Sequence, residues 1–201
     1  VHVGKRGTIR WRNIRIKTLD TDEPAAGATA IETVYIVPMS HIDIGFTAPP
    51  LDVADGAARH TQQALELARK DPEYVWNFEV FWELEQWLRP RQRPGFPPAA
   101  SPATRPAPAA PAVEKLLQLV RQGRFGIGAA YVNPHSSLMS AWALDQLFRV
   151  PTEWAREQGL TLNWATINDV PGHPADLPRF VAANGVRYLL LGTNQGLSKP
   201  L

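Results

Sequence analysis

The stretch Val34-Tyr-Ile-Val-Pro-Met-Ser-His-Ile-Asp-Ile-Gly-Phe-Thr47 joins a predicted strand to the polar residues that follow its carboxyl end. Its apolar run Val34–Val37 is rich in β-branched and aromatic residues, which is typical of a buried strand. Pro38 lacks an N–H and therefore belongs at the end of that strand. An extended backbone beyond it would direct the imidazole of His41 and the carboxylate of Asp43 into one pocket. Zinc accepts both ligand types, although an isolated His-x-Asp pair is more often structural than metal-binding.

The composition of the 201-residue chain is that of a globular protein, with a hydrophobic share of 44% and a charged share of 20%. This length suffices for one sizeable domain or one and a half. The formal net charge is +2 and the arginines are scattered, so no nucleic-acid partner is expected. The absence of cysteine excludes disulfides, cysteine zinc ligands and thiol nucleophiles. No apolar run is long enough to span a bilayer, so no membrane partner is expected.

Residues 1–20 alternate polar and apolar side chains, which is the pattern of half-buried antiparallel strands. Within them, Gly7-Thr-Ile-Arg-Trp-Arg-Asn-Ile-Arg-Ile-Lys17 resembles the last strands of 3-keto-disaccharide hydrolase-like β-sandwich domains. The resemblance implies that residues 1–20 are the tail of a preceding carbohydrate-related domain, and the small, polar residues 21–31 read as a linker. The alternative is an N-terminal hairpin of the main domain. The domain pairing would suit a periplasmic or secreted protein.

Predicted strands and helices alternate from residue 32 to residue 191. Strands are expected over 34–37, 74–78, 125–132, 160–167 and 186–191, and helices over 52–70, 80–88, 112–122, 139–158 and 175–183. This alternation predicts a parallel sheet with right-handed crossovers, either open or closed into a barrel. Residues 89–111 are dominated by Pro, Ala and Arg and are expected to be a surface insertion without regular structure.

Polar residues gather where the predicted strands end, which is where α/β folds bind their ligands. Glu79 ends the second strand and is a site candidate, whereas Glu83 and Glu85 fall at helix positions expected to be exposed. Three further clusters follow other strands: Ser40, His41 and Asp43; Asn133 and His135; Asn168, Asp169 and His173. A pocket with histidine and two aspartates but no cysteine suits a divalent metal, Zn²⁺ first.

Several of these motifs together resemble glycoside hydrolase family 38, the zinc-dependent α-mannosidases. Pro38-Met-Ser-His-Ile-Asp-Ile-Gly-Phe-Thr47 looks like the opening motif of the family, and Asp169-Val-Pro-Gly-His173 looks like its nucleophile loop. Trp76-Asn-Phe-Glu79 is similar to a strand-two motif of bacterial members. Gly123-Arg-Phe125 with Tyr131-Val-Asn-Pro134 is similar to their third-strand segment. Order and spacing agree over residues 32–195.

The resemblance implies that residues 32–201 form an incomplete parallel β/α barrel of the seven-stranded type. It implies that His41, Asp43 and Asp169 bind Zn²⁺ and that Asp169 is also the nucleophile of a retaining mechanism on a carbohydrate substrate. Phe46, Glu79 and His173 are the expected substrate-binding residues. A fourth ligand, a histidine, and the acid/base are expected beyond residue 201, so the chain is expected to be an inactive fragment of a longer polypeptide.

Two departures from the family pattern leave other functions open. The third loop holds Asn133-Pro-His-Ser136 where many members carry an acidic residue, and Met39 replaces the first histidine of the opening motif. One alternative is a metal-dependent polysaccharide deacetylase-like hydrolase, in which water rather than aspartate is the nucleophile. Another is a carbohydrate-binding pseudoenzyme without catalytic activity.

Overall fold

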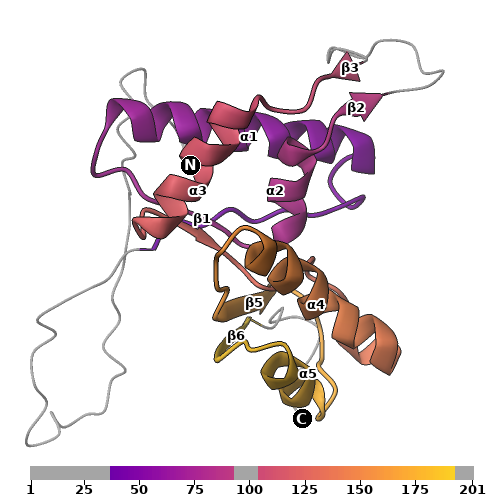
Figure 1. Cartoon of the computed structure of the whole chain (residues 1–201). Helices are drawn as coiled ribbons and strands as arrows, with labels where there is room; N and C mark the ends of the chain where they lie inside the picture. The colour runs from indigo at the N-terminus through magenta and orange to yellow at the C-terminus, as the bar shows by residue number, and fades with distance from the viewer. Residues whose placement is uncertain (1–36, 93–103, 193–201) are drawn as a thin grey trace, which may run out of the picture. The chain divides into compact units, whose positions relative to one another are not determined.

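The computed structural model describes residues 37–92 and 104–192 (Figure 1). The predictions for residues 1–20 and 21–31 lie outside these ranges. The described elements follow in this order: α1 (Pro50–Lys70), β1 (Trp76–Phe78), α2 (Phe81–Leu88), β2 (Arg91–Gln92), β3 (Thr104–Arg105), α3 (Ala110–Arg121), β4 (Phe125–Ile127), the 3-10 turn η1 (Ser136–Leu138), α4 (Ala141–Glu157), β5 (Trp164–Asn168), α5 (Leu177–Ala183) and β6 (Tyr188–Gly192). Among them, every helix is too short or too polar to cross a membrane.

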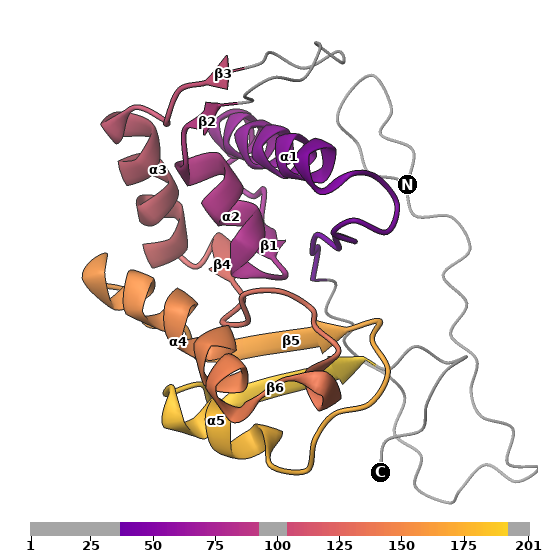
Figure 2. The same cartoon turned by 90° about the vertical axis from the view of Figure 1, so that its right-hand side faces the viewer.

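Two pairs of strands run in parallel. Trp76 of β1 pairs with Phe125 of β4, and Trp164 of β5 pairs with Tyr188 of β6. Strands β5 and β6 lie side by side in Figure 2. Met39 forms a parallel bridge with Asn77, so the segment before α1 runs beside β1. These pairs and the helices between them are the units from which a β/α barrel is built. The seven-stranded barrel itself stays a prediction, because each sheet among the described residues has two strands.

A main-chain hydrogen bond links the two strand pairs. The N–H of Gly128 donates to the carbonyl of Phe78 at 2.9 Å, and the next N–H, that of Ala129, donates to the carbonyl of Trp164 at 2.8 Å. The chain after β4 therefore passes from the edge of β1 to the edge of β5. This transfer explains why β4 ends at Ile127, whereas the sequence pattern predicts a strand as far as residue 132.

Helix α1 buries a face of small side chains, chiefly Ala57, Ala58, Ala64 and Ala68, and packs against α2. Alanine favours the helix and leaves room for a close neighbour. The helix begins at Pro50, two residues before the predicted start, because proline is well suited to the first helical position.

The core lies between the strands and the helices that follow them. Its largest fully buried apolar side chains are Phe78, Leu84, Leu116, Leu119, Ile127, Phe148, Ile167 and Leu177. Phe78 meets Phe125 edge to face, with ring centroids 6.0 Å apart. Each such side chain contributes about 1.5–3 kcal/mol by leaving water. Two of the largest fully buried side chains are charged residues, Glu79 and Glu83.

Helix α2 corrects the prediction that Glu83 and Glu85 are exposed, since they are only 2% and 7% exposed. Glu83 accepts a hydrogen bond of 2.7 Å from the hydroxyl of Ser40. Glu85 accepts one of 2.6 Å from the hydroxyl of Tyr131 and pairs with Arg89. Hydrogen-bond donors from distant segments thus compensate for the loss of water around these carboxylates.

The predicted structureless insertion is bounded more tightly than expected. Residues 93–103 lie outside the described ranges, but β2 and β3 pair in antiparallel fashion on either side of them. The guanidinium of Arg105 donates to the carbonyls of Trp87, Gln86 and Arg89 at the end of α2. Helix α3 begins at Ala110, within the range that composition assigned to the insertion.

Candidate metal centre

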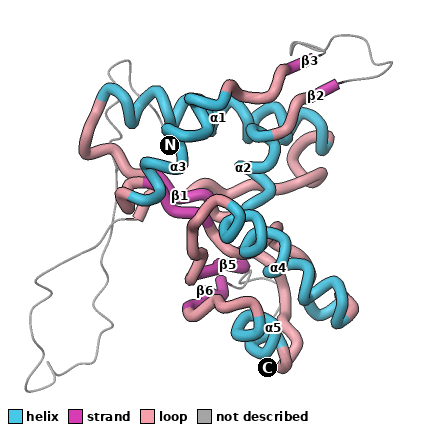
Figure 3. Tube along the Cα trace, in the orientation of Figure 1, coloured by secondary structure: helices cyan, strands magenta, loops and turns pink. Residues whose placement is uncertain are grey.

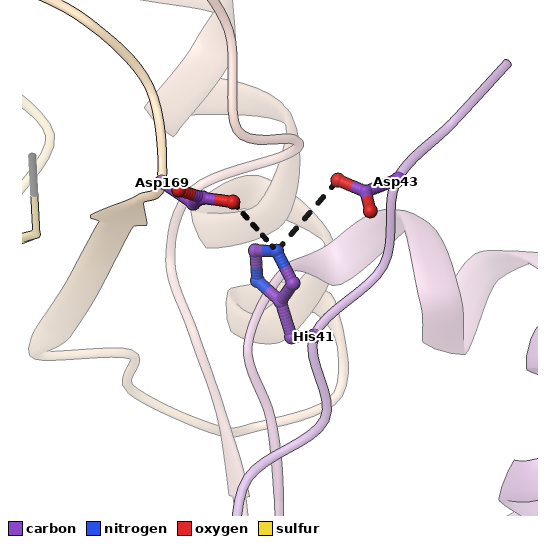
Figure 4. Close-up of side chains that lie close together, drawn as sticks. All are labelled: His41, Asp43 and Asp169. Carbon is purple, nitrogen blue, oxygen red and sulfur yellow. Dashed lines mark ion pairs between the residues drawn. The ribbon is translucent and has the colours of Figure 1, made fainter. Parts of the chain in front are cut away.

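The structure brings His41, Asp43 and Asp169 together. One ligand atom from each residue lies within 4.8 Å of the other two. Nε2 of His41 is 3.7 Å from Oδ1 of Asp43 and 3.8 Å from Oδ2 of Asp169 (Figure 4). The first two residues follow the segment that pairs with β1, and the third follows β5. The carboxyl ends of these strands therefore deliver the three side chains to one place.

The backbone of Asp169 is in the left-handed region, with a φ of 58°. Its N–H donates to the carbonyl of Gly192 at the end of β6, at 2.8 Å. A left-handed residue other than glycine is strained by about 1–3 kcal/mol, although aspartate tolerates the region better than most. Such strain persists only where neighbouring contacts fix the chain. Asp169 directly follows β5, which ends at Asn168. Figure 3 shows the loop that leads from β5 to α5.

Glu79 lies behind His41 and not beside the other two carboxylates. Its Oε2 is 2.9 Å from Nδ1 of His41, and the residue is 1% exposed. Burial raises the pKa of the Glu79 carboxyl, while His41 and the nearby amides of Asn133 and Asn168 oppose that rise. The carboxylate is therefore stabilised by the hydrogen-bond donors around it.

Ser40 connects Glu79 to a second buried carboxylate. Its hydroxyl accepts the main-chain N–H of Glu79 at 3.2 Å and donates to Oε1 of Glu83 at 2.7 Å. The pKa of Glu83 is raised to about 7, chiefly by burial; the hydrogen bond from Ser40 opposes the rise and the nearby Glu79 adds to it. The sequence pattern assigned Glu83 no such role. Its position four residues after Glu79, on a helix that follows the strand, was the available signal.

A pocket of about 540 Å³ opens over the three converging side chains. It is lined by His41, Ile42, Asp43, Ile44, Phe46, Val132, Asn133, His135, Asn168, Asp169, Val170 and Pro171. Phe46 is 89% exposed there, and Oδ1 of Asn133 accepts the N–H of Asn168 at 3.1 Å. The lining thus combines carboxylates and amides with apolar side chains, as small polar ligands require.

Two of the expected substrate-binding residues are absent from this lining. Glu79 lies beneath His41, as described above. His173 is half-buried, and its Nδ1 is 2.8 Å from the hydroxyl of Ser136, which is fully buried. Burial lowers the pKa of His173. This hydrogen bond joins the loop after β5 to the loop after β4, and no sequence motif predicted that contact.

The donor set fits a divalent cation. One imidazole nitrogen and two carboxylate oxygens are ligands that zinc accepts, at about 2.0–2.2 Å each. Two atoms at that distance from one ion lie at most about 4.4 Å apart, and the 3.7 Å and 3.8 Å separations are below that limit. His41, Asp43 and Asp169 could thus share an ion with small side-chain adjustments.

No family model and no curated protein sequence matches this chain. The structure is similar to that of an alpha-mannosidase from Enterococcus faecalis V583, with a TM-score of 0.60 and 16% sequence identity. The match covers 77% of this chain but only 16% of the mannosidase chain. The chain therefore has a mannosidase-like fold over most of its length and spans a small part of that larger protein.

Proposed function

We propose that this chain forms part of a zinc-dependent retaining glycoside hydrolase of the α-mannosidase type, similar to family 38. The observation that carries the proposal is the convergence of His41, Asp43 and Asp169 in the lining of a pocket, with ligand atoms within 4.8 Å of one another. The similarity of fold to an alpha-mannosidase supports it. A closed seven-stranded barrel completed outside the described residues is part of the same proposal.

Within this proposal the three residues hold Zn²⁺ and Asp169 has a second role. A retaining glycosidase needs one carboxylate to attack the anomeric carbon and another to protonate the leaving oxygen. Asp169 is half exposed at the pocket and can reach a bound sugar. When bound, zinc would act as a Lewis acid and a template for sugar hydroxyls. The proposal places the proton donor and a fourth ligand, a histidine, outside the described residues.

The pocket lining supports a carbohydrate substrate. Phe46 presents an exposed ring at the pocket, and the apolar face of a sugar packs well on such a ring. Asn133 and Asn168 supply amide groups of the kind that bind hydroxyls. The loop Asn133-Pro-His-Ser136 takes the place of a loop in which many family members carry an acidic residue, so the identity of the sugar is a separate question from the reaction.

An assay of the full-length protein that contains this chain tests the proposal. The metal-stripped protein should regain hydrolysis of an aryl α-mannoside on addition of Zn²⁺, with retention of configuration at the anomeric carbon by NMR. The 201-residue chain alone should bind Zn²⁺ weakly and release no sugar. Release of acetate from an acetylated polysaccharide, without release of sugar, would favour a deacetylase. Binding of sugar without any turnover would favour a pseudoenzyme.

A further inference from the structure

The geometry points to Glu79 as the positioning residue of the metal centre: by accepting the Nδ1–H of His41 it presents the lone pair of Nε2 to Asp43 and Asp169. This inference rests on the proposed function, since it concerns the same metal site. It differs from the sequence-based expectation, in which Glu79 contacts the sugar. A carboxylate that is 1% exposed and outside the pocket lining acts through a neighbour rather than on a substrate.

The distances determine which nitrogen of His41 carries the proton. A neutral imidazole has one N–H and one lone pair, and an ionised carboxylate can only accept a hydrogen bond. With His41 neutral and Glu79 ionised, Nδ1, at 2.9 Å from Oε2 of Glu79, is the donor. Nε2 then carries the lone pair and faces Asp43 and Asp169 at 3.7 Å and 3.8 Å, which is too long for hydrogen bonds.

Three electron-pair donors consequently face one point. Without a cation, a lone pair directed at two carboxylates is an unfavourable arrangement, whereas a metal ion between them makes it favourable. In metal sites the second nitrogen of a ligating histidine commonly donates to a carboxylate, which fixes the tautomer and the ring orientation. Glu79 is placed for that role on the far side of the ring.

Glu79 is itself fixed by the backbone on both sides. Its N–H donates to the hydroxyl of Ser40, the residue before His41. Its carbonyl lies against Gly128, where any Cβ atom would collide with it. Histidine and glutamate are thus attached to adjacent segments whose spacing is set by main-chain contacts.

The test compares Glu79→Gln with Glu83→Gln, a matched change of the other buried carboxylate, in the 201-residue chain. Nitrogen-15 shifts of His41 in the metal-free protein at about pH 8 report the tautomer, and competition with a chelator reports Zn²⁺ affinity. We expect a predominantly Nδ1–H tautomer in the wild type and a mixture in Glu79→Gln. Zn²⁺ affinity should fall about 10–100-fold in Glu79→Gln and less than about threefold in Glu83→Gln.

Two results would overturn the inference: a wild-type His41 that is predominantly Nε2–H, or a tautomer and affinity that Glu79→Gln leaves unchanged. If Glu79→Gln does not fold, as judged by circular dichroism, the wild-type tautomer and the Glu79→Asp variant still decide. If the wild type binds no Zn²⁺ but its tautomer depends on Glu79, the metal site of the proposed function fails and only the role of Glu79 in fixing the His41 tautomer stands. If Zn²⁺ binds without any dependence on Glu79, only this inference fails.

Discussion

Oγ of Ser40 lies 2.7 Å from Oε1 of Glu83, so the segment that leads into the candidate metal centre is hydrogen-bonded to helix α2. Glu83 is 2% exposed and its pKa is raised to about 7, chiefly by burial. A carboxyl group whose pKa is higher in the folded than in the unfolded chain makes the free energy of unfolding depend on pH. The contact thus has a consequence that can be measured in the metal-free protein.

Glu83 should make the protein less stable as the pH rises. The folded chain keeps a proton on Glu83 up to about pH 7, whereas the unfolded chain loses it near pH 4.5. The contribution of Glu83 to the free energy of unfolding is therefore full below pH 4.5 and is lost as the pH rises through about 7. The expected loss is about 3 kcal/mol. Glu83→Gln should remove this pH dependence. At pH 8 it should have a higher free energy of unfolding than the wild type, as measured by urea unfolding with EDTA present. The exposed Glu114→Gln serves as control, and equal pH profiles for all three proteins would contradict the prediction.

Asp169 should be required for both metal binding and hydrolysis. Asp169→Asn keeps the volume of the side chain, and asparagine also tolerates the left-handed backbone, but it removes the negative charge that covalent attack needs. We expect a loss of at least 10-fold in Zn²⁺ affinity and no measurable aryl α-mannoside hydrolysis in the full-length protein. Asp176→Asn, an exposed change in the same loop region, should leave both unchanged. Normal turnover by Asp169→Asn would remove it from the mechanism.

Gly128 should tolerate no side chain. A methyl group there would collide with the main-chain carbonyl of Glu79, which forces β1 and β4 apart. Gly128→Ala should therefore lower the free energy of unfolding by about 1–3 kcal/mol and weaken Zn²⁺ binding. Gly56→Ala on α1 is the control, because only the end of Arg59 lies nearby, at 3.9 Å, and the change should be neutral or stabilising by up to about 1 kcal/mol. Equal effects of the two substitutions on stability would show that Gly128 makes no close contact.

The Ser136–His173 hydrogen bond should weaken in acid. Burial lowers the pKa of His173, so its contribution to stability is present above the unfolded pKa of about 6.5 and falls as the pH drops below it. His173→Gln should lose this acid sensitivity, as measured by thermal unfolding between about pH 5 and pH 8. The exposed His60→Gln on α1 should retain the wild-type profile. An acid sensitivity that survives His173→Gln would assign it to other groups.

The gathering of the candidate ligands could be predicted in part from the sequence. His41 and Asp43 follow the parallel bridge at Met39, Asp169 follows β5, and parallel strands end at one edge. What the pattern could not supply was the partner of each buried side chain. Glu79 was placed at a strand end correctly, yet its contact with Nδ1 of His41 depends on a segment 38 residues away.

Local periodicity by itself determined the long helices, because the residues that form and end a helix are near neighbours in the chain. Helix α1 shows this in its alanine-rich face and in the Asp71-Pro72 pair that follows its end. The burial of Glu83 and Glu85 was decided only by tertiary structure. Their positions read as exposed until Ser40 and Tyr131, 43 and 46 residues away, supply the hydrogen bonds that replace water. Burial of a charged group depends on the donors that the whole fold brings to it, and no local pattern encodes those donors.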